Sequence, residues 1–254
     1  MELYIIRHAQ STNNALADQT DRVTDPPLTR IGEQQAERLA EHLESGWQPI
    51  TWSPVPVPPN METRGMLRGY GLTDLYCSPM LRSLQTAQAI SRSIDLTPEV
   101  WIDIHEQGGM FLEEGEGADR VAVGKPGLTR SQILARFPGY VLPDGITERG
   151  WYNRDYEDWP ACHVRAARVA ETFFAWAATG NSRRIAIVSH GGFVDALLKA
   201  FLRAGPPAEN NDGDRRYFYL HFNTAMDRID FDPEGRLRVA YLNRVVHLPP
   251  EMIT

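Results

Sequence analysis

Two short apolar runs, each ending in a histidine, constrain this chain more than any other feature. The first run, Leu3–Ile6, ends at Arg7 and His8, and the second, Ile185–Val188, ends in a Ser-His pair whose histidine is His190. Short runs rich in β-branched and aromatic residues are typical of buried strands. Parallel strands of one sheet end at the same edge, which is where open α/β sheets bind ligands. If the two strands are neighbours, the pattern therefore brings both imidazoles together.

A third run, Asp74–Ser78, leads into Pro79, and proline is favoured at the first position of a helix. Arg82 then falls in the first helical turn, close to the positive end of the helix dipole. A lone Arg-His pair is also consistent with the polar edge of a strand. Three strand ends that gather two arginines, two histidines and helix N-terminal amides instead predict a receptor for a phosphoryl group.

Elsewhere the pattern alternates between amphipathic and apolar segments. Thr29 is expected to cap a helix over 30–43. Further helices are expected at 79–93, 129–137, 161–178 and 193–202, and further strands at 96–104, 217–222, 225–231 and 237–245, with a hairpin turn at Asp232–Gly235. We expect a single domain over residues 1–254.

Two segments interrupt this alternation. Gly46–Gly71 is dense in proline, which excludes a helix interior or a central strand and predicts a surface insertion. Glu113–Asp158 is a second insertion, in which arginines and aromatic side chains cluster between Arg149 and Tyr156. Two interpretations remain open for it: a surface cap packed on its own aromatics, or a lid that selects the substrate.

The composition excludes several classes of partner. A formal charge of −7 argues against a nucleic-acid surface or an anionic membrane. Cys77 and Cys162 form neither a disulfide framework nor a metal-ligand spacing, which suits a reducing compartment. No apolar run approaches the roughly 20 residues needed to span a bilayer, and we find no signal peptide. We therefore expect a soluble cytoplasmic protein.

In combination, the motifs resemble the histidine phosphatase superfamily, and within it the phosphoglycerate-mutase-like branch. The motifs that carry the resemblance are Arg7-His8, Ser78-Pro-x-x-Arg-x-x-Gln-Thr-Ala87 and Ser189-His190-Gly191-Gly192, with weaker similarity at Leu28-Thr29-x-x-Gly32 and Asn223-Thr224-Ala225. The resemblance and the alternating pattern predict an α/β protein. The expected form is a three-layer α/β/α sandwich with a mostly parallel central sheet and inserted cap segments.

The resemblance also implies roles for individual residues. His8 would carry a phosphohistidine, Glu106 would protonate the leaving oxygen and activate water, and Arg7, Arg82 and His190 would hold the phosphoryl oxygens. The two guanidiniums should help to keep His8 neutral. Glu113, Glu114 and Glu116 remain alternatives to Glu106, and the expected substrate contacts are Gln10, Ser11, Asn14 and Gly191.

One position departs from the family pattern. Ala9 stands where relatives usually have glycine. Alanine is excluded only where the backbone needs positive φ, so we expect the site to remain active, with at most a slightly displaced loop.

The predicted function is a phosphatase that hydrolyses a small phosphorylated metabolite. A phosphoglycerate mutase is the alternative. Relatives with mutase activity carry a basic and tyrosine cluster soon after the acid residue, whereas glycines and glutamates follow Glu106 here, which favours hydrolysis. A non-catalytic binding protein on the same scaffold is a third hypothesis. Histidines at zinc-binding helical spacing are absent, so we expect neither a metal nor another cofactor. Neither the metabolite nor the oligomeric state follows from these motifs.

Overall fold

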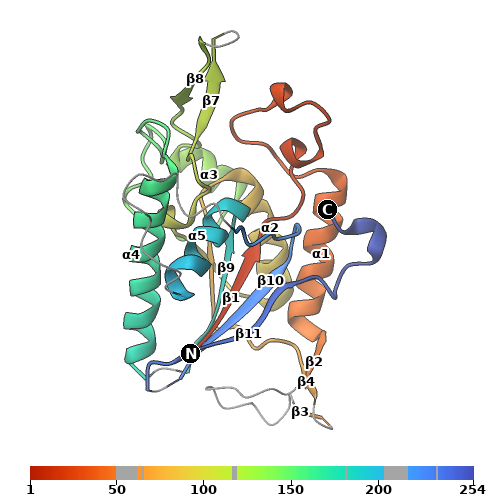
Figure 1. Ribbon diagram of the computed structural model, residues 1–254. Coiled ribbons are helices and arrows are strands. Elements are labelled where there is room, and N and C mark those ends of the chain that lie inside the picture. Colours follow the sequence, from red (N-terminus) through yellow and green to blue (C-terminus); the bar gives the residue numbers. More distant parts are fainter. Residues whose placement is uncertain (50–61, 64–65, 116–118, 181, 203–216, 233) are drawn as a thin grey trace.

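The computed structural model describes residues 1–49, 62–63, 66–115, 119–180, 182–202, 217–232 and 234–254. Its centre is a six-stranded sheet in the order β11-β10-β1-β9-β5-β6 (Figure 1). The strands of this sheet are β1 (Glu2–Arg7), β5 (Asp74–Cys77), β6 (Pro98–Val100), β9 (Arg184–Ser189), β10 (Met226–Phe231) and β11 (Leu237–Arg244). Strands β1, β9, β5 and β6 pair in parallel, whereas β10 pairs antiparallel with both β1 and β11.

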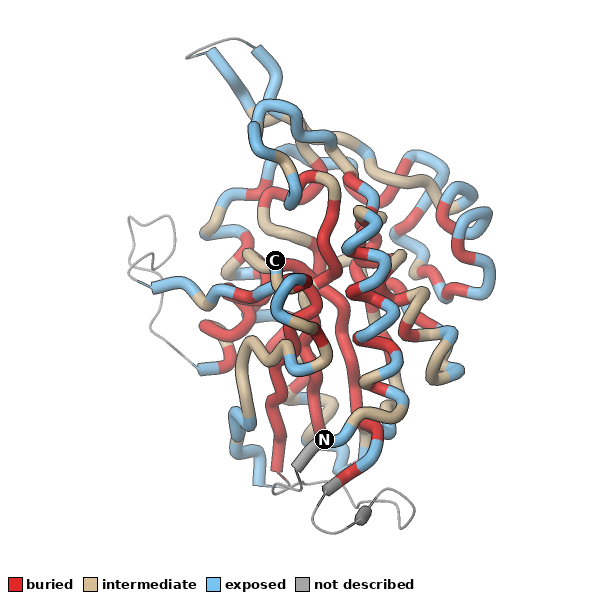
Figure 2. The backbone as a smooth tube through the Cα atoms, turned by 90° about the vertical axis from the view of Figure 1, so that its right-hand side faces the viewer, coloured by how far each residue is buried: buried red, intermediate tan, exposed pale blue. Residues whose placement is uncertain are grey.

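Helices cover both faces of this sheet. The helices are α1 (Arg30–Ser45), α2 (Leu81–Ile94), α3 (Arg130–Arg136), α4 (Trp159–Ala178) and α5 (Gly191–Leu202). Alternate residues of β1 serve the two faces: Tyr4 and Ile6 belong to the core under α1 and α2, while Leu3 and Ile5 belong to the core under α4 and α5. Figure 2 shows the fully buried strands running between these helical layers. The predicted three-layer α/β/α sandwich with a mostly parallel sheet is confirmed.

Helix α1 forms for the reasons that its sequence indicates. The Thr29 side chain accepts a hydrogen bond from the Gly32 amide and so caps the first turn. The apolar stripe over 36–43 is buried, and its residues contact the α2 side of the sheet. The predicted helix therefore forms, and it continues two residues further, to Ser45.

Two predicted strands are wrong in part or in full. Only Pro98–Val100 of the segment 96–104 is a strand, since its partner β5 ends at Cys77 and the chain then turns through a short 3₁₀ helix, Ile102–Ile104. Residues 217–222 are not a strand. Two of their backbone amides bind side chains instead of a neighbouring strand: Asp195 accepts from the Tyr219 amide, and Asn243 accepts from the Phe222 amide.

The two segments expected as insertions contain small sheets of their own. Strands β2 (Trp47–Pro49), β3 (Glu62–Thr63) and β4 (Met66–Arg68) lie in the first segment, whose remaining proline-rich part falls outside the described residues. The second segment overlaps a hairpin of β7 (Phe111–Glu114) and β8 (Val121–Gly124), which projects from the top of the molecule in Figure 1. It also includes α3, which forms within the predicted range. No described helix is long and apolar enough to cross a membrane.

Candidate active site

The register of two neighbouring strands brings the two histidines together. Strands β1 and β9 pair in parallel with Arg7 opposite Ser189, so His8 and His190 leave the sheet side by side. Their ring centroids lie 5.0 Å apart. The structure thus places both imidazoles at one sheet edge, as the strand pattern predicts.

The surroundings of His8 fix its tautomer and its charge. Its Nδ1–H donates to the carbonyl of Ala9 at 2.7 Å, and its Nε2 accepts from Nε of Arg82 at 3.1 Å. Burial lowers the pKa of His8 well below its usual value, and the positive charges of Arg82 and then Arg7 lower it further. His8 is therefore a neutral imidazole whose unprotonated Nε2 faces a guanidinium. The sequence pattern predicts the effect of the two guanidiniums on the pKa of His8, but not the larger effect of burial.

Arg82 is held at the start of α2, as expected, and Asp25 helps to hold it. The Asp25 carboxylate accepts from the Leu81 amide at 2.9 Å and lies 3.9 Å from Nη1 of Arg82. It therefore caps α2 and provides a countercharge to the buried arginine. Asp25 lies in a proline-containing loop, and no local sequence pattern shows that this loop packs on α2.

His190 and Arg7 present unused donors at the same place. Nε2 of His190 shares a hydrogen bond of 2.6 Å with Oγ of Ser78, at the end of β5. Arg7 donates from Nη1 to the carbonyl of His221. Among the residues that the structure describes, Nδ1 of His190 and Nε of Arg7 are buried without a hydrogen-bond partner. Buried polar atoms normally find partners, so these two indicate a ligand with acceptor oxygens.

Glu106 completes the group from the loop that follows the 3₁₀ helix Ile102–Ile104. Its Oε1 accepts from the Gln107 and Phe193 amides, both at 2.9 Å, and its Oε2 accepts from the Gly192 amide at 3.4 Å. The carboxylate therefore sits at the N-terminus of α5, where the helix dipole favours negative charge. Its charge also acts on Arg7 and raises the pKa of that residue, against the larger lowering effect of burial.

Arg7, His8, Arg82 and Glu106 line a cleft of about 590 Å³, within the usual range for small-molecule sites, whereas His190 is not among its lining residues. Residues from the first loop and from the β7–β8 hairpin form its outer walls. The lining residues away from the histidines include Asp18, Thr20, Arg22, Phe111, Glu113, Arg120 and Trp159. The outer cleft is therefore mixed in charge and partly aromatic.

A sequence profile of the histidine phosphatase superfamily (branch 1) matches residues 3–56 and 61–243. The chain belongs to the histidine phosphatase superfamily. It is thereby a phosphoric monoester hydrolase by class. No curated protein matches it significantly in sequence.

Solved structures of other superfamily members share the fold at low sequence identity. YhfR of Bacillus stearothermophilus is 18% identical with a TM-score of 0.58, and the match covers 97% of this chain and 98% of that one. A mycobacterial glucosyl-3-phosphoglycerate phosphatase is 18% identical, with a TM-score of 0.53 and coverage of 95% and 98%. Phosphoserine phosphatase of Entamoeba histolytica, in complex with 3-phosphoglyceric acid, is 18% identical, with a TM-score of 0.52 and coverage of 98% and 99%.

The predicted substrate contacts separate into two groups within this superfamily site. Ser11 and Asn14 line the cleft, and the two side chains bond to each other at 3.0 Å. Gln10 does not line it, because its side-chain oxygen accepts from Thr29 at the start of α1. Gly192 lines the cleft in place of Gly191, whose added Cβ would lie 3.5 Å from Nε of Arg7. Gln10 thus joins the loop to the start of α1, Gly191 lies next to Arg7, and neither residue lines the cleft.

Ala9 fits the loop that follows His8. It is fully buried, and it is not one of the non-glycine residues with positive φ. Its amide donates to Oγ1 of Thr86 at 3.1 Å, so α2 supports the loop directly. Asn223 supports the same backbone from the other side by donating to the carbonyl of His8 at 2.9 Å. A glycine is therefore not required at this position.

Several other candidate residues have structural partners. His105 donates to the Ile102 carbonyl and packs against Trp151 and Tyr152, which are buried and also contact each other. Both aromatic residues belong to the main core, whereas Glu113 and Arg120 of the same insertion line the cleft, so both interpretations of this insertion, cap or lid, stay predictions. Among the described residues, no three histidine, cysteine or acidic side chains gather to hold a metal ion. The expectation of metal-independent catalysis stays a prediction.

Proposed function

We propose that this chain hydrolyses small phosphate monoesters through a phosphohistidine on His8. The observation that carries the proposal is the neutral, buried His8, which accepts a hydrogen bond from Arg82 and lines a cleft of small-molecule size together with Arg7 and Glu106. A nucleophilic imidazole must present an unprotonated nitrogen, and arginines are suited to bind the phosphoryl oxygens in a bidentate manner. Two of the structural relatives are named as phosphatases of phosphoserine and of glucosyl-3-phosphoglycerate, and both compounds belong to this class of ester.

The proposed reaction has two in-line steps. In the first, the Nε2 lone pair of His8 attacks phosphorus while the ester P–O bond breaks, and Glu106 in its protonated form gives its proton to the leaving oxygen. Arg7, Arg82 and Nδ1 of His190 would stabilise the charge on the phosphoryl oxygens. In the second, the Glu106 carboxylate takes a proton from water, the water oxygen attacks phosphorus, and the P–N bond electrons return to His8.

The test is a screen for phosphate release from phosphoserine, 3-phosphoglycerate, glucosyl-3-phosphoglycerate and sugar phosphates. We expect turnover of at least one ester, loss of that turnover in His8→Ala, and an acid-labile phosphoprotein on rapid quenching. Equal rates for the wild type and His8→Ala would overturn the proposal. Isomerisation of phosphoglycerate faster than phosphate release would identify a mutase instead.

We further propose that the reaction needs no metal ion, since the chemistry above uses only arginine, histidine and a carboxyl group. The same turnover is expected after dialysis against a chelator. Activity that is lost on chelation and restored by zinc would overturn this part of the proposal.

A further inference from the structure

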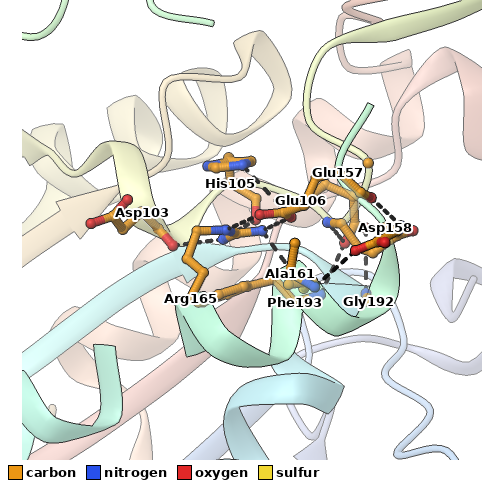
Figure 3. Close-up of polar contacts among 12 residues, drawn as sticks. Asp103, His105, Glu106, Glu157, Asp158, Ala161, Arg165, Gly192 and Phe193 are labelled. Atoms are coloured by element: carbon orange, nitrogen blue, oxygen red, sulfur yellow. Dashed lines mark hydrogen bonds and ion pairs between the residues drawn. The ribbon is translucent and has the colours of Figure 1, made fainter. Parts of the chain in front are cut away.

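A buried arginine outside the cleft contacts the loop that carries Glu106. Arg165 lies on α4, and only 1% of its surface is exposed. Its Nη1 donates to the carbonyls of Asp103 at 2.7 Å and His105 at 3.0 Å. Its Nε and Nη2 donate to the two carboxylate oxygens of Glu157, at 2.8 and 2.5 Å. Figure 3 shows this side chain reaching from α4 to all three partners.

The segment before Glu106 is a short 3₁₀ helix, Ile102–Ile104, and side chains bind several carbonyls in and next to it. The carbonyl of Ile102 accepts from Nδ1 of His105, and that of Ile104 accepts from Oγ of Ser189. The carbonyls of Asp103 and His105 accept from Arg165. Buried carbonyls that lose such a donor draw the backbone toward another partner or toward water. Arg165 therefore holds the backbone on which Glu106 stands.

The same guanidinium also lies against the second support of Glu106. Its Cζ lies 4.5 Å from the centre of the Phe193 ring, and the Phe193 amide donates to Oε1 of Glu106. Arg165 thus contacts both the loop that carries the carboxyl group and the helical turn that anchors it. A lysine cannot replace these contacts, because one ammonium group does not form the planar fork that binds Glu157 and two carbonyls together.

We propose that Arg165 is a positioning residue for proton transfer by Glu106. It does not line the cleft, and it holds the backbone that keeps the Glu106 carboxyl in the cleft that His8 also lines. The inference rests on the proposed function, in which Glu106 protonates that oxygen. Its consequence depends on the leaving group: an alkoxide needs the proton much more than an acidic phenolate does.

The test compares kcat/KM for p-nitrophenyl phosphate, which has a good leaving group, with kcat/KM for β-glycerophosphate, which has a poor one. This parameter reports the steps up to formation of the phosphohistidine, and so it separates protonation of the leaving oxygen from the later attack of water. General-acid catalysis contributes about 10²- to 10⁴-fold. We therefore expect Glu106→Gln to lower the glycerophosphate to nitrophenyl phosphate ratio by that order, and Arg165→Lys to lower it at least tenfold.

Two further variants make the result decisive. Arg228→Lys is the matched control, because Arg228 is equally buried and paired with Glu2 and Asp230 at the opposite part of the sheet. Its ratio should equal that of the wild type. Arg165→Met combined with Glu157→Leu removes both charges, so that no buried carboxylate is left unpaired if the single variant does not fold. Circular dichroism verifies the fold of each variant.

The outcomes separate the two proposals. If the Arg165 variants lower kcat/KM equally for both esters, or leave kcat/KM unchanged for both, Arg165 has only a structural role. The inference then fails while the phosphatase function stands. If the wild type cleaves neither these esters nor any in the wider screen, or if Glu106→Gln does not change the ratio, the proposed mechanism fails and the inference falls with it.

Discussion

Mild acid is expected to destabilise this fold through three buried histidines, His8, His105 and His190. Burial is the main cause that lowers each pKa well below its usual value; the next contribution comes from Arg82 for His8 and His190, and from Arg165 for His105. In the unfolded chain each imidazole takes up a proton near its ordinary pKa, about 6.5. The unfolded state then binds more protons than the folded state, so the free energy of unfolding falls as the pH drops below that value.

The size of the effect follows from the same linkage. An imidazole that stays neutral in the folded state loses about 1.2 kcal/mol of stabilisation between pH 7.0 and pH 5.5. Three such groups lose about 4 kcal/mol, against a total stability of about 5–15 kcal/mol for a typical domain. His247, whose pKa burial lowers to about 3, and His42, whose pKa burial also lowers, add to this loss. The buried carboxyls of Asp25 and Asp230, whose pKa values burial raises, act in the opposite direction. The comparison of a variant with the wild type removes their contribution.

His105→Gln is the suitable variant, because His105 does not line the cleft. The free energy of unfolding is measured by urea denaturation at pH 7.0 and pH 5.5. The decrease between these two values is expected to be about 1.2 kcal/mol smaller in the variant than in the wild type. Equal decreases in both proteins would show that the His105 imidazole is protonated in the folded state, which would refute the argument.

Three further substitutions test the supports of the site. Ser78→Ala removes the hydrogen-bond partner of His190 Nε2. It should lower kcat/KM about tenfold, which corresponds to a loss of about 1–2 kcal/mol of transition-state stabilisation. An unchanged kcat/KM would mean that this bond does not orient the ring. Gly192→Ala places a Cβ 2.8 Å from Oε1 of Glu106, so phosphatase turnover should fall while the thermal midpoint stays within a few degrees; full turnover would show that Glu106 moves freely. Asp25→Ala removes the acceptor for the Leu81 amide. It should lower the free energy of unfolding in urea by about 1 kcal/mol and also weaken the binding of phosphate. Wild-type values of both quantities would contradict the role of Asp25 at Arg82.

The meeting of His8, His190 and Arg82 was predictable because it depends on short-range patterns. Each residue follows an apolar run or a helix start, and parallel strands end at a common edge. The fold class follows from the same alternation. The strand-like pattern of residues 217–222 was misleading, since side chains of Asp195 and Asn243 satisfy its backbone instead of another strand.

The supports of the site could not be predicted from local patterns. Arg165 lies on the face of α4 that also carries Cys162 and Val169, but an arginine is rarely buried, and no local pattern shows that its partners belong to a loop about 60 residues earlier in the chain. Asp25 likewise caps a helix that begins far along the sequence. Such contacts are fixed only when the layers pack, because burial and long-range partners decide them.

The β7–β8 hairpin forms a separate two-stranded sheet, although Phe111, Leu112 and Glu113 contribute to one wall of the cleft. The proposed nucleophile His8 follows β1 of the large sheet, and Arg82 lies on α2, so neither belongs to the hairpin. A change of side chain at Phe111, Leu112 or Glu113 would therefore alter one wall of the cleft and leave the elements that hold His8 and Arg82 unchanged.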